Sequence, residues 1–181
     1  SKAWEEEAEK RGLSNVKTTP GALDFYITES SKAVFTNNKI FTEGELMARY
    51  EIELEAYVRK IQIEGRVLGE LSMSYIFPAA TSYMTELAQS IKTMKDIGYG
   101  DEQIATQKTV LEKISLHLQG MKTKVDAMVE ARRKANKIDN AREMATLYCD
   151  EVRPFFDEIR YHADRLERYV CLLYTSPSPR D

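Results

Sequence analysis

The chain has 181 residues, of which 43% are hydrophobic and 30% charged, a composition that suits one folded domain or one domain with part of another. Its formal net charge of −3 gives no indication of a nucleic-acid partner, and charges interrupt every apolar run, so we expect no membrane partner either. The few prolines and glycines favour long helices over a strand-rich fold.

The N-terminal quarter predicts two short helical stretches. Residues 1–11 predict the end of a helix, because their last turn is basic and Gly12 suits the position that follows a helix. Thr19 and Pro20 predict the start of a second helix, with threonine as the N-cap and proline at the first helical position. We expect this helix to run to about Val34.

The strongest start signal in the sequence comes next. Thr42 and Glu45 have the spacing of a capping box, and Phe41 and Leu46 have that of a hydrophobic staple. Pro78 then permits either a kink within one very long helix or a short break between two. The apolar residues that recur at helical spacing before this proline are Leu46, Tyr50, Leu54, Tyr57, Ile61, Leu68, Leu71 and Tyr75.

The pattern resumes after Pro78 and ends in a glycine-containing turn at residues 97–100. Asp101 predicts the N-cap of the next helix. This helix has a seam of an antiparallel hairpin or coiled coil. The seam residues are Ile104, Leu111, Ile114, Leu118, Met121, Val125 and Met128.

The last helix is expected to begin near Asp139 or Asn140, to bend at Pro154 and to end at about Tyr169. Long helices joined by short turns must pack antiparallel to bury their apolar faces. The predicted fold class is therefore all-α, with long antiparallel helices that form a helical hairpin or bundle behind short N-terminal helices.

Tests for chemical motifs give no catalytic, cofactor-binding or metal-binding residue. The sequence has no glycine-rich phosphate loop and no Cys-x-x-Cys or His-Glu-x-x-His motif. A di-iron bundle needs Glu-x-x-His on two helices. Glu158 and His162 are four residues apart, and His117 has no glutamate three residues before it. We therefore expect His162 to be a partly buried packing residue and His117 to lie beside the seam.

Other polar groups have structural interpretations as well. Residues 132–134 could bind a phosphate, but a basic stretch here is typical of a solvated helix end. An acidic metal cluster is also conceivable, although its members are expected to be solvated or paired with Arg153 and Arg160. The acidic residues concerned are Asp150, Glu151, Asp157 and Glu158.

Two residues are assigned to packing. Trp4 is predicted to be a packing anchor. Cys149 is predicted to be a small buried hydrophobe, because no histidine lies near it in sequence. If residues 171–181 are set aside, Cys149 is the one cysteine, which excludes an internal disulfide and fits a cytoplasmic protein.

Residues 171–181 resemble one reading frame of a transposase adapter used in DNA sequencing libraries. We therefore expect them to be a non-native tail on a fragment of a longer protein. The alternative is a natural Ser/Pro-rich tail.

Several separated blocks resemble, in order, the region that follows the catalytic core of type III glutamine synthetases. The most specific is 149–162, which contains Glu-Val-Arg-Pro and Phe-Asp-Glu-Ile-Arg-Tyr-His. The other blocks are Ala3-Trp4 with 10–15, 59–64 with 66–69, and 128–132 with 134–137.

This resemblance implies a division of the chain. Residues 1–58 would be the closing helices of the catalytic domain, 59–170 the type III C-terminal helical extension, and 171–181 the non-native tail. It further implies a parent enzyme that ligates ammonia to glutamate with ATP and Mg²⁺ or Mn²⁺, within a cytoplasmic dodecamer.

None of the family's catalytic, nucleotide or metal residues matches a position in this sequence. The chain itself is therefore expected to be inactive and to hold no cofactor. Its partners would be the upstream catalytic domain and further copies of the chain, in a structural or assembly role. The alternative is a stand-alone helical coiled-coil interaction module with no enzymatic activity.

Overall fold

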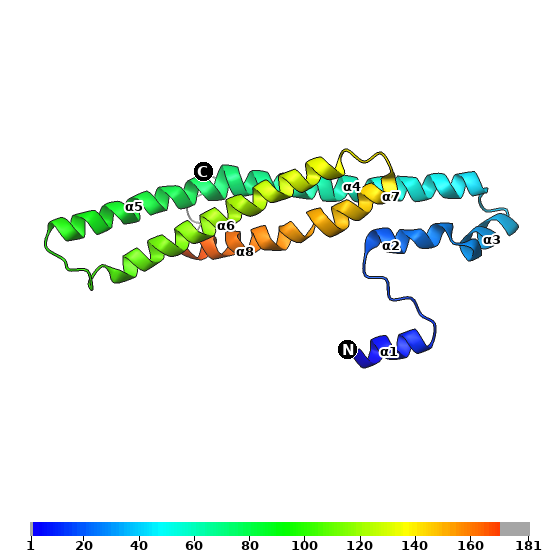
Figure 1. The fold of residues 1–181 in the computed structure, drawn as a ribbon, viewed down its shortest axis with the longest axis horizontal. Helices are drawn as coiled ribbons and strands as arrows, with labels where there is room; N and C mark the ends of the chain where they lie inside the picture. Colours follow the sequence, from blue (N-terminus) through cyan, green and yellow to red (C-terminus); the bar gives the residue numbers. More distant parts are fainter. Residues whose placement is uncertain (1, 171–181) are drawn as a thin grey trace, which may run out of the picture. The chain divides into compact units, whose positions relative to one another are not determined.

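The computed structural model describes residues 2–170, and every regular element within them is helical (Figure 1). The all-α prediction is confirmed, and residues 171–181 lie outside the described part. The elements are α1 (Lys2–Lys10), α2 (Thr19–Leu23), η1 (Asp24–Ile27), α3 (Glu29–Asn37), α4 (Glu43–Leu71), η2 (Ser72–Ile76), α5 (Phe77–Asp96), α6 (Ala105–Ala135), α7 (Ala141–Leu147), η3 (Tyr148–Val152) and α8 (Pro154–Val170).

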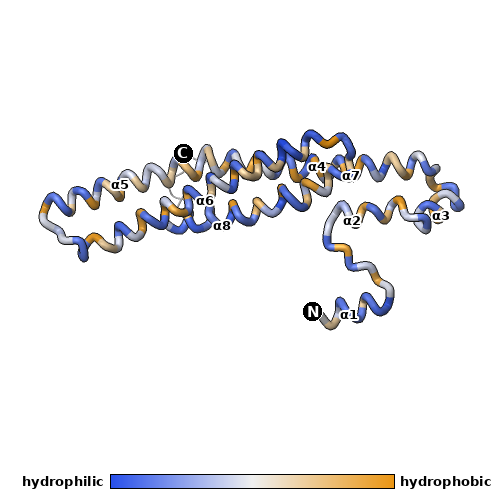
Figure 2. Tube along the Cα trace, in the orientation of Figure 1, coloured by the Kyte–Doolittle hydropathy of each residue, from blue (hydrophilic) through white to orange (hydrophobic). Residues whose placement is uncertain are grey.

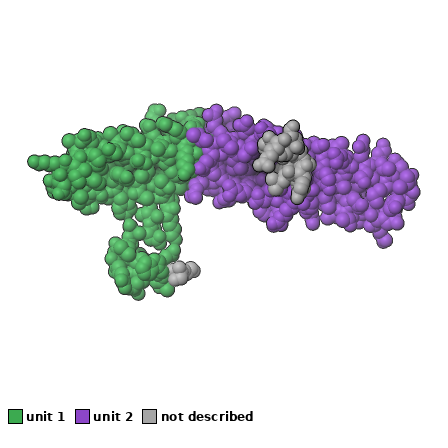
Figure 3. Space-filling model, turned by 180° about the vertical axis from the view of Figure 1, so that it is seen from behind, with its two compact units in different colours: residues 1–62, 134–150 green, residues 63–133, 151–181 purple. Residues whose placement is uncertain are grey.

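The chain divides into two compact units (Figure 3). Unit 1 consists of Ser1–Gln62 and Lys134–Asp150, and unit 2 of Ile63–Arg133 and Glu151–Asp181. Apolar and polar residues alternate along the long helices of both units, as amphipathic packing requires (Figure 2).

The first helix of unit 1 ends as the sequence predicts. Gly12 has a φ of +73°, which a residue with a side chain rarely adopts. The amide of Leu13 donates to the carbonyl of Ala8, and that of Gly12 to the carbonyl of Glu9. These two bonds form a Schellman motif, which satisfies carbonyls at the end of α1.

The single helix predicted from Thr19 to Val34 is wrong. The structure breaks it into α2, the 3₁₀ turn η1 and α3. Thr28 causes the break, because its extended backbone starts α3 and its side chain accepts a hydrogen bond from the amide of Ser31. The N-cap of α2 is Thr18 rather than Thr19, and its side chain makes no capping bond.

The capping box at the start of α4 is confirmed. The amide of Glu45 donates to Thr42 Oγ1 at 3.2 Å, and the amide of Thr42 donates to Glu45 Oε2 at 2.8 Å. Downstream in unit 1, Asn140 caps α7 by accepting from the amide of Glu143 at 2.9 Å, again as predicted.

The core of unit 1 lies where α4 meets the segment around α7. Its buried side chains are Pro20, Leu46, Tyr50, Leu54, Val58, Ile61, Ala135, Ala145, Tyr148 and Cys149. Tyr148 is completely buried, and its hydroxyl donates to Asn136 Oδ1 at 2.6 Å. A buried phenol needs such an acceptor, so this bond fixes the loop before α7 against the core.

Pro78 and Pro154 each follow a π-helical turn. η2 ends two residues before Pro78, and η3 ends two residues before Pro154. A proline has no N–H, and its ring crowds the carbonyl four residues earlier. The widened turn before each ring relieves this clash, and the amide of Phe77 accordingly donates five residues back to Ser72. A helix therefore follows each π-turn, and the bend expected at Pro154 stays a prediction.

In unit 2 the predicted seam along α6 is buried except at Leu111, which is half-buried. Ile104, Ile114, Met121 and Met128 are completely buried, and Leu118 and Val125 nearly so. The apolar positions of α5 are half-buried. Figure 1 shows α5 and α6 running in opposite directions on either side of a short turn. This is the predicted antiparallel hairpin. The prediction of Asp101 as the N-cap is wrong, because α6 begins at Ala105 and the carboxylate of Asp101 contacts Lys95 and Lys108 instead.

The prediction for Leu71 and Tyr75 is wrong, because both are exposed. Small residues occupy the buried face of this segment instead, namely Gly65, Gly69 and Ser72. The Cβ position of Gly65 lies 3.2 Å from the ring of Phe156, and that of Gly69 lies 3.6 Å from Met128. The glycines bring the backbones close together, so a search for large apolar residues selects the wrong face.

Candidate functional site

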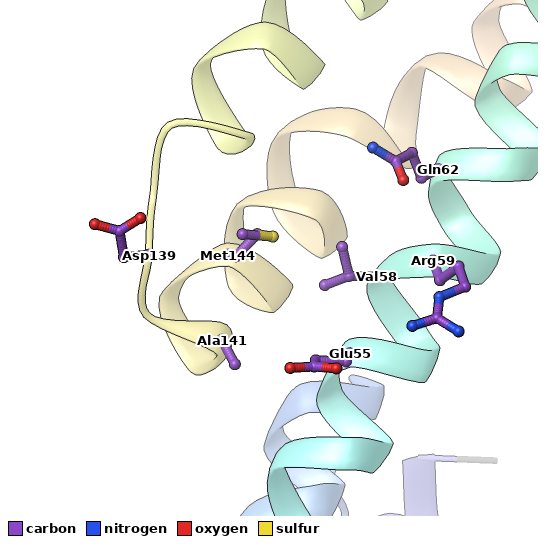
Figure 4. A pocket seen from close by; sticks show the side chains of 7 residues that line it. All are labelled: Glu55, Val58, Arg59, Gln62, Asp139, Ala141 and Met144. Atoms are coloured by element: carbon purple, nitrogen blue, oxygen red, sulfur yellow. The ribbon is translucent and has the colours of Figure 1, made fainter.

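A hollow of about 280 Å³ in unit 1 lies between α4 and the segment that leads into α7 (Figure 4). Val58 and Met144 point toward each other across it, with Glu55 and Arg59 one helical turn apart on α4. Gln62, Asp139 and Ala141 complete the lining. These groups provide charge and apolar surface, but the lining contains no nucleophile with an adjacent base.

A cluster of polar side chains in unit 1 centres on the carboxylate of Asp24. Arg142 binds it in a bidentate manner, from Nε to Oδ1 at 2.6 Å and from Nη2 to Oδ2 at 2.7 Å. Tyr50 donates its hydroxyl to Oδ1 at 2.7 Å. Arg142 also contacts Thr146 on its own helix. The cluster thus joins η1, α4 and α7, which are far apart in sequence.

The ionisation of this cluster follows from its contacts. The hydrogen bond from Arg142 is the main reason that the pKa of Asp24 lies below its ordinary value. Burial, supported by the hydrogen bond to Asp24, raises the pKa of Tyr50 to about 12. An ionised carboxylate that accepts three hydrogen bonds from side chains of α4 and α7 ties these helices to η1, so we assign the cluster a structural role.

Unit 2 brings His117 of α6 and His162 of α8 together, with their Nδ1 atoms 3.1 Å apart. Both imidazoles are half-buried, as predicted for His162. Burial is the main cause that lowers the pKa of each ring, assisted by His162 and Arg165 for His117 and by Lys124 for His162. The sequence alone did not predict this contact, because the two histidines are 45 residues apart along the chain and lie on different helices.

Other residues singled out from the sequence fall in scattered places. Cys149 is buried, as predicted. Trp4 is 63% exposed, so its prediction as a packing anchor is wrong within this chain, where no neighbouring element covers its ring. Glu158 pairs with Lys124 at 2.7 Å, rather than with the predicted arginines. Arg133 lies 3.7 Å from Glu130, as one turn of a solvated helix end allows.

The described residues contain no group of three or more His, Cys, Asp or Glu side chains that could hold a metal ion. No helix among residues 2–170 is long and apolar enough to cross a membrane.

Comparison with known proteins identifies the family. Residues 1–95, just over half of the chain, match the model of the glutamine synthetase C-terminal domain. This chain belongs to that family. Glutamine synthetase from Bacteroides fragilis (strain YCH46) is 41% identical over 174 residues, which cover 94% of this chain and 24% of the relative.

Two further relatives agree with the glutamine synthetase assignment. The glutamine synthetase of Butyrivibrio fibrisolvens is 32% identical over 96% of the chain, and the type-3 glutamine synthetase of Dictyostelium discoideum is 28% identical over 92%. The chain spans about a quarter of the length of these relatives. The resemblance to the type III enzymes is thereby confirmed.

Proposed function

We propose that this chain is the C-terminal structural segment of a glutamine synthetase, and that it packs on the catalytic domain and contributes to assembly. The observation that carries the proposal is a run of exposed large apolar side chains between residues 4 and 52. These are Trp4, Leu13, Val16, Phe25, Tyr26, Val34, Ile40, Met47 and Ile52. In this proposal the catalytic domain covers these side chains, since apolar groups that are exposed in one chain can be buried against another protein part.

The match to the family supports the choice of partner. A segment that corresponds to one quarter of its relatives has the other three quarters as its natural neighbour. In this proposal residues 1–58 close the catalytic domain and residues 59–170 form the type III extension. The parent enzyme would ligate ammonia to glutamate with ATP and Mg²⁺ or Mn²⁺, in a cytoplasmic homo-oligomer that the family resemblance suggests to be a dodecamer.

Fragment complementation tests the proposal. The Bacteroides fragilis enzyme without the quarter that matches this chain would be co-expressed with residues 1–181. We expect the two parts to co-purify and glutamine formation to exceed that of the truncated enzyme alone. A variant in which Trp4, Val34 and Ile40 are changed to serine serves as the control and should lose both effects.

If the wild-type chain elutes alone and leaves the activity of the truncated enzyme unchanged, the proposal is contradicted. The alternative of a stand-alone coiled-coil interaction module would then be favoured.

A further inference from the structure

The 181-residue chain contains only two histidines, and the fold brings them into contact. His117 lies on α6 and His162 on α8, both within unit 2. Their rings lie 5.3 Å apart between centroids at an angle of 58°. This meeting is independent of the apolar surface that supports the proposed function.

The Nδ1 atoms are 3.1 Å apart. Two imidazole nitrogens that bind one ion at about 2.0–2.1 Å, in tetrahedral or cis octahedral geometry, stand roughly 2.8–3.4 Å from each other. We propose that His117 and His162 form a two-imidazole site for a divalent transition-metal ion of the Zn²⁺ or Cu²⁺ class, with water in the remaining coordination positions.

The surroundings hold both rings in place. An added Cβ at Gly120 would lie 2.3 Å from Cε1 of His162, so this imidazole rests directly on the backbone of α6. The ring of Tyr161 meets both imidazoles edge-on, with centroids 5.9 Å from His117 and 5.2 Å from His162. Ligands that are fixed before the ion arrives lose little conformational entropy on binding.

The protonation states suit a metal ion. Burial favours the neutral imidazoles, which are the forms that bind metals. In the metal-free pair one Nδ1 donates its proton to the other. Binding requires the donor ring to carry its proton on Nε2 instead, which frees both Nδ1 lone pairs without a change in charge.

The nearby charges limit the affinity. Lys124 and Arg165 lie close enough to disfavour a cation, and Glu158 partly offsets them while it pairs with Lys124. Since no third side-chain ligand joins the pair among the described residues, the site is weaker than a structural zinc centre. The sequence contains no local metal-binding motif, whereas this pair forms only after folding.

The test uses the 181-residue chain without a histidine tag and with Cys171→Ser, which removes a competing thiol. Zn²⁺ at ten times its dissociation constant should raise the midpoint of thermal unfolding by roughly 3–5 °C. Cu²⁺ added in equimolar amount should give an electron paramagnetic resonance spectrum with imidazole nitrogen hyperfine coupling.

Three variants define the outcome. His117→Gln and His162→Gln should each weaken Zn²⁺ binding roughly tenfold or more, with helicity verified by circular dichroism. Arg165→Gln removes a positive charge and should strengthen binding severalfold, an effect that a purely structural pair would not show. If a histidine variant fails to fold, the Cu²⁺ spectrum of the wild-type chain decides.

The proposal is overturned if 1 mM Zn²⁺ leaves the unfolding midpoint unchanged, if a folded His162→Gln variant binds as tightly as the wild type, or if the Cu²⁺ spectrum lacks imidazole coupling. Each of these results concerns unit 2 alone. Fragment complementation can therefore succeed or fail independently of them.

Discussion

The α5–α6 hairpin of unit 2 and the N-terminal stretch of unit 1 use apolar residues in different ways. In α6 the large apolar residues at seam positions face inward and form a core within the chain. Between residues 4 and 52 many large apolar residues stay exposed, and short elements are held by caps and by the Asp24 cluster. The seam of α6 is thus buried within the chain, whereas the proposed function assigns the exposed side chains between residues 4 and 52 to a surface that the catalytic domain covers.

A matched pair of substitutions in α6 gives the strongest test of whether this helix packs through its buried seam. Leu118 is 7% exposed, while Leu116, two residues earlier, is 62% exposed. Leu118→Ala should lower the free energy of unfolding by roughly 2–5 kcal/mol, because it leaves a cavity in the seam. Leu116→Ala should change it by less than about 0.5 kcal/mol. Urea unfolding measures both, and equal effects would show that α6 is not packed through this seam.

The next largest effect on stability is expected where α6 and α8 approach each other closely in unit 2. Gly120→Ala should destabilise the chain by roughly 1–3 kcal/mol, since the new Cβ displaces the ring of His162. Gly44, in the first turn of α4, has nothing within 4 Å of its Cβ position. Gly44→Ala should therefore be neutral or stabilise by up to about 1 kcal/mol. Stabilisation by both substitutions in thermal melts would refute the close contact.

The Asp24 cluster predicts a smaller, pH-dependent effect in unit 1. Asp24→Asn should cost about 1 kcal/mol at pH 7, a figure that allows for the 40% exposure of the carboxylate. Because the pKa of Asp24 is lower in the folded chain, its contribution is present above pH 3.8 and disappears as the pH falls through the folded value. The difference between wild type and variant in urea melts should therefore shrink below pH 3.8. A constant difference down to pH 2 would contradict this account.

The smallest effect is expected at the exposed tryptophan. Trp4→Ser should leave the unfolding of the isolated chain unchanged within about 0.5 kcal/mol, because the side chain is 63% exposed. The same substitution, together with Val34→Ser and Ile40→Ser, should weaken association with the catalytic part. Loss of stability in the isolated chain would instead indicate that Trp4 packs within it.

The sequence predicts those features that depend on neighbouring residues. The capping box at Thr42, the end of α1 at Gly12, the Asn140 cap and the seam of α6 all arise within one or a few helical turns, and all are confirmed. The break at Thr28 could also have been predicted from the sequence, since the capping hydrogen bond between Thr28 and Ser31 spans only three residues. The capping signal at Thr28 was overlooked because one continuous helix was predicted from Thr19 to Val34.

The remaining errors have a common physical cause. The buried face at Gly65 and Gly69 is determined by the helices that approach it, so side-chain hydrophobicity alone selected Leu71 and Tyr75 incorrectly. The Asp24–Arg142 pair joins residues 118 apart, and the histidine pair joins residues 45 apart. No local spacing encodes such contacts. These contacts depend on which helices pack together, whereas the sequence pattern predicts each helix separately.

The most direct test of the central claim follows Trp4, the one tryptophan of the chain. The chain would carry 5-fluorotryptophan, so that a single ¹⁹F resonance reports the exposure of this ring through its shift between H₂O and D₂O. On addition of the Bacteroides fragilis catalytic part, we predict that the resonance moves and loses its solvent shift as the ring becomes buried. An unchanged resonance with its full solvent shift, at concentrations where both parts are folded, would contradict the claim that this surface packs on the catalytic domain.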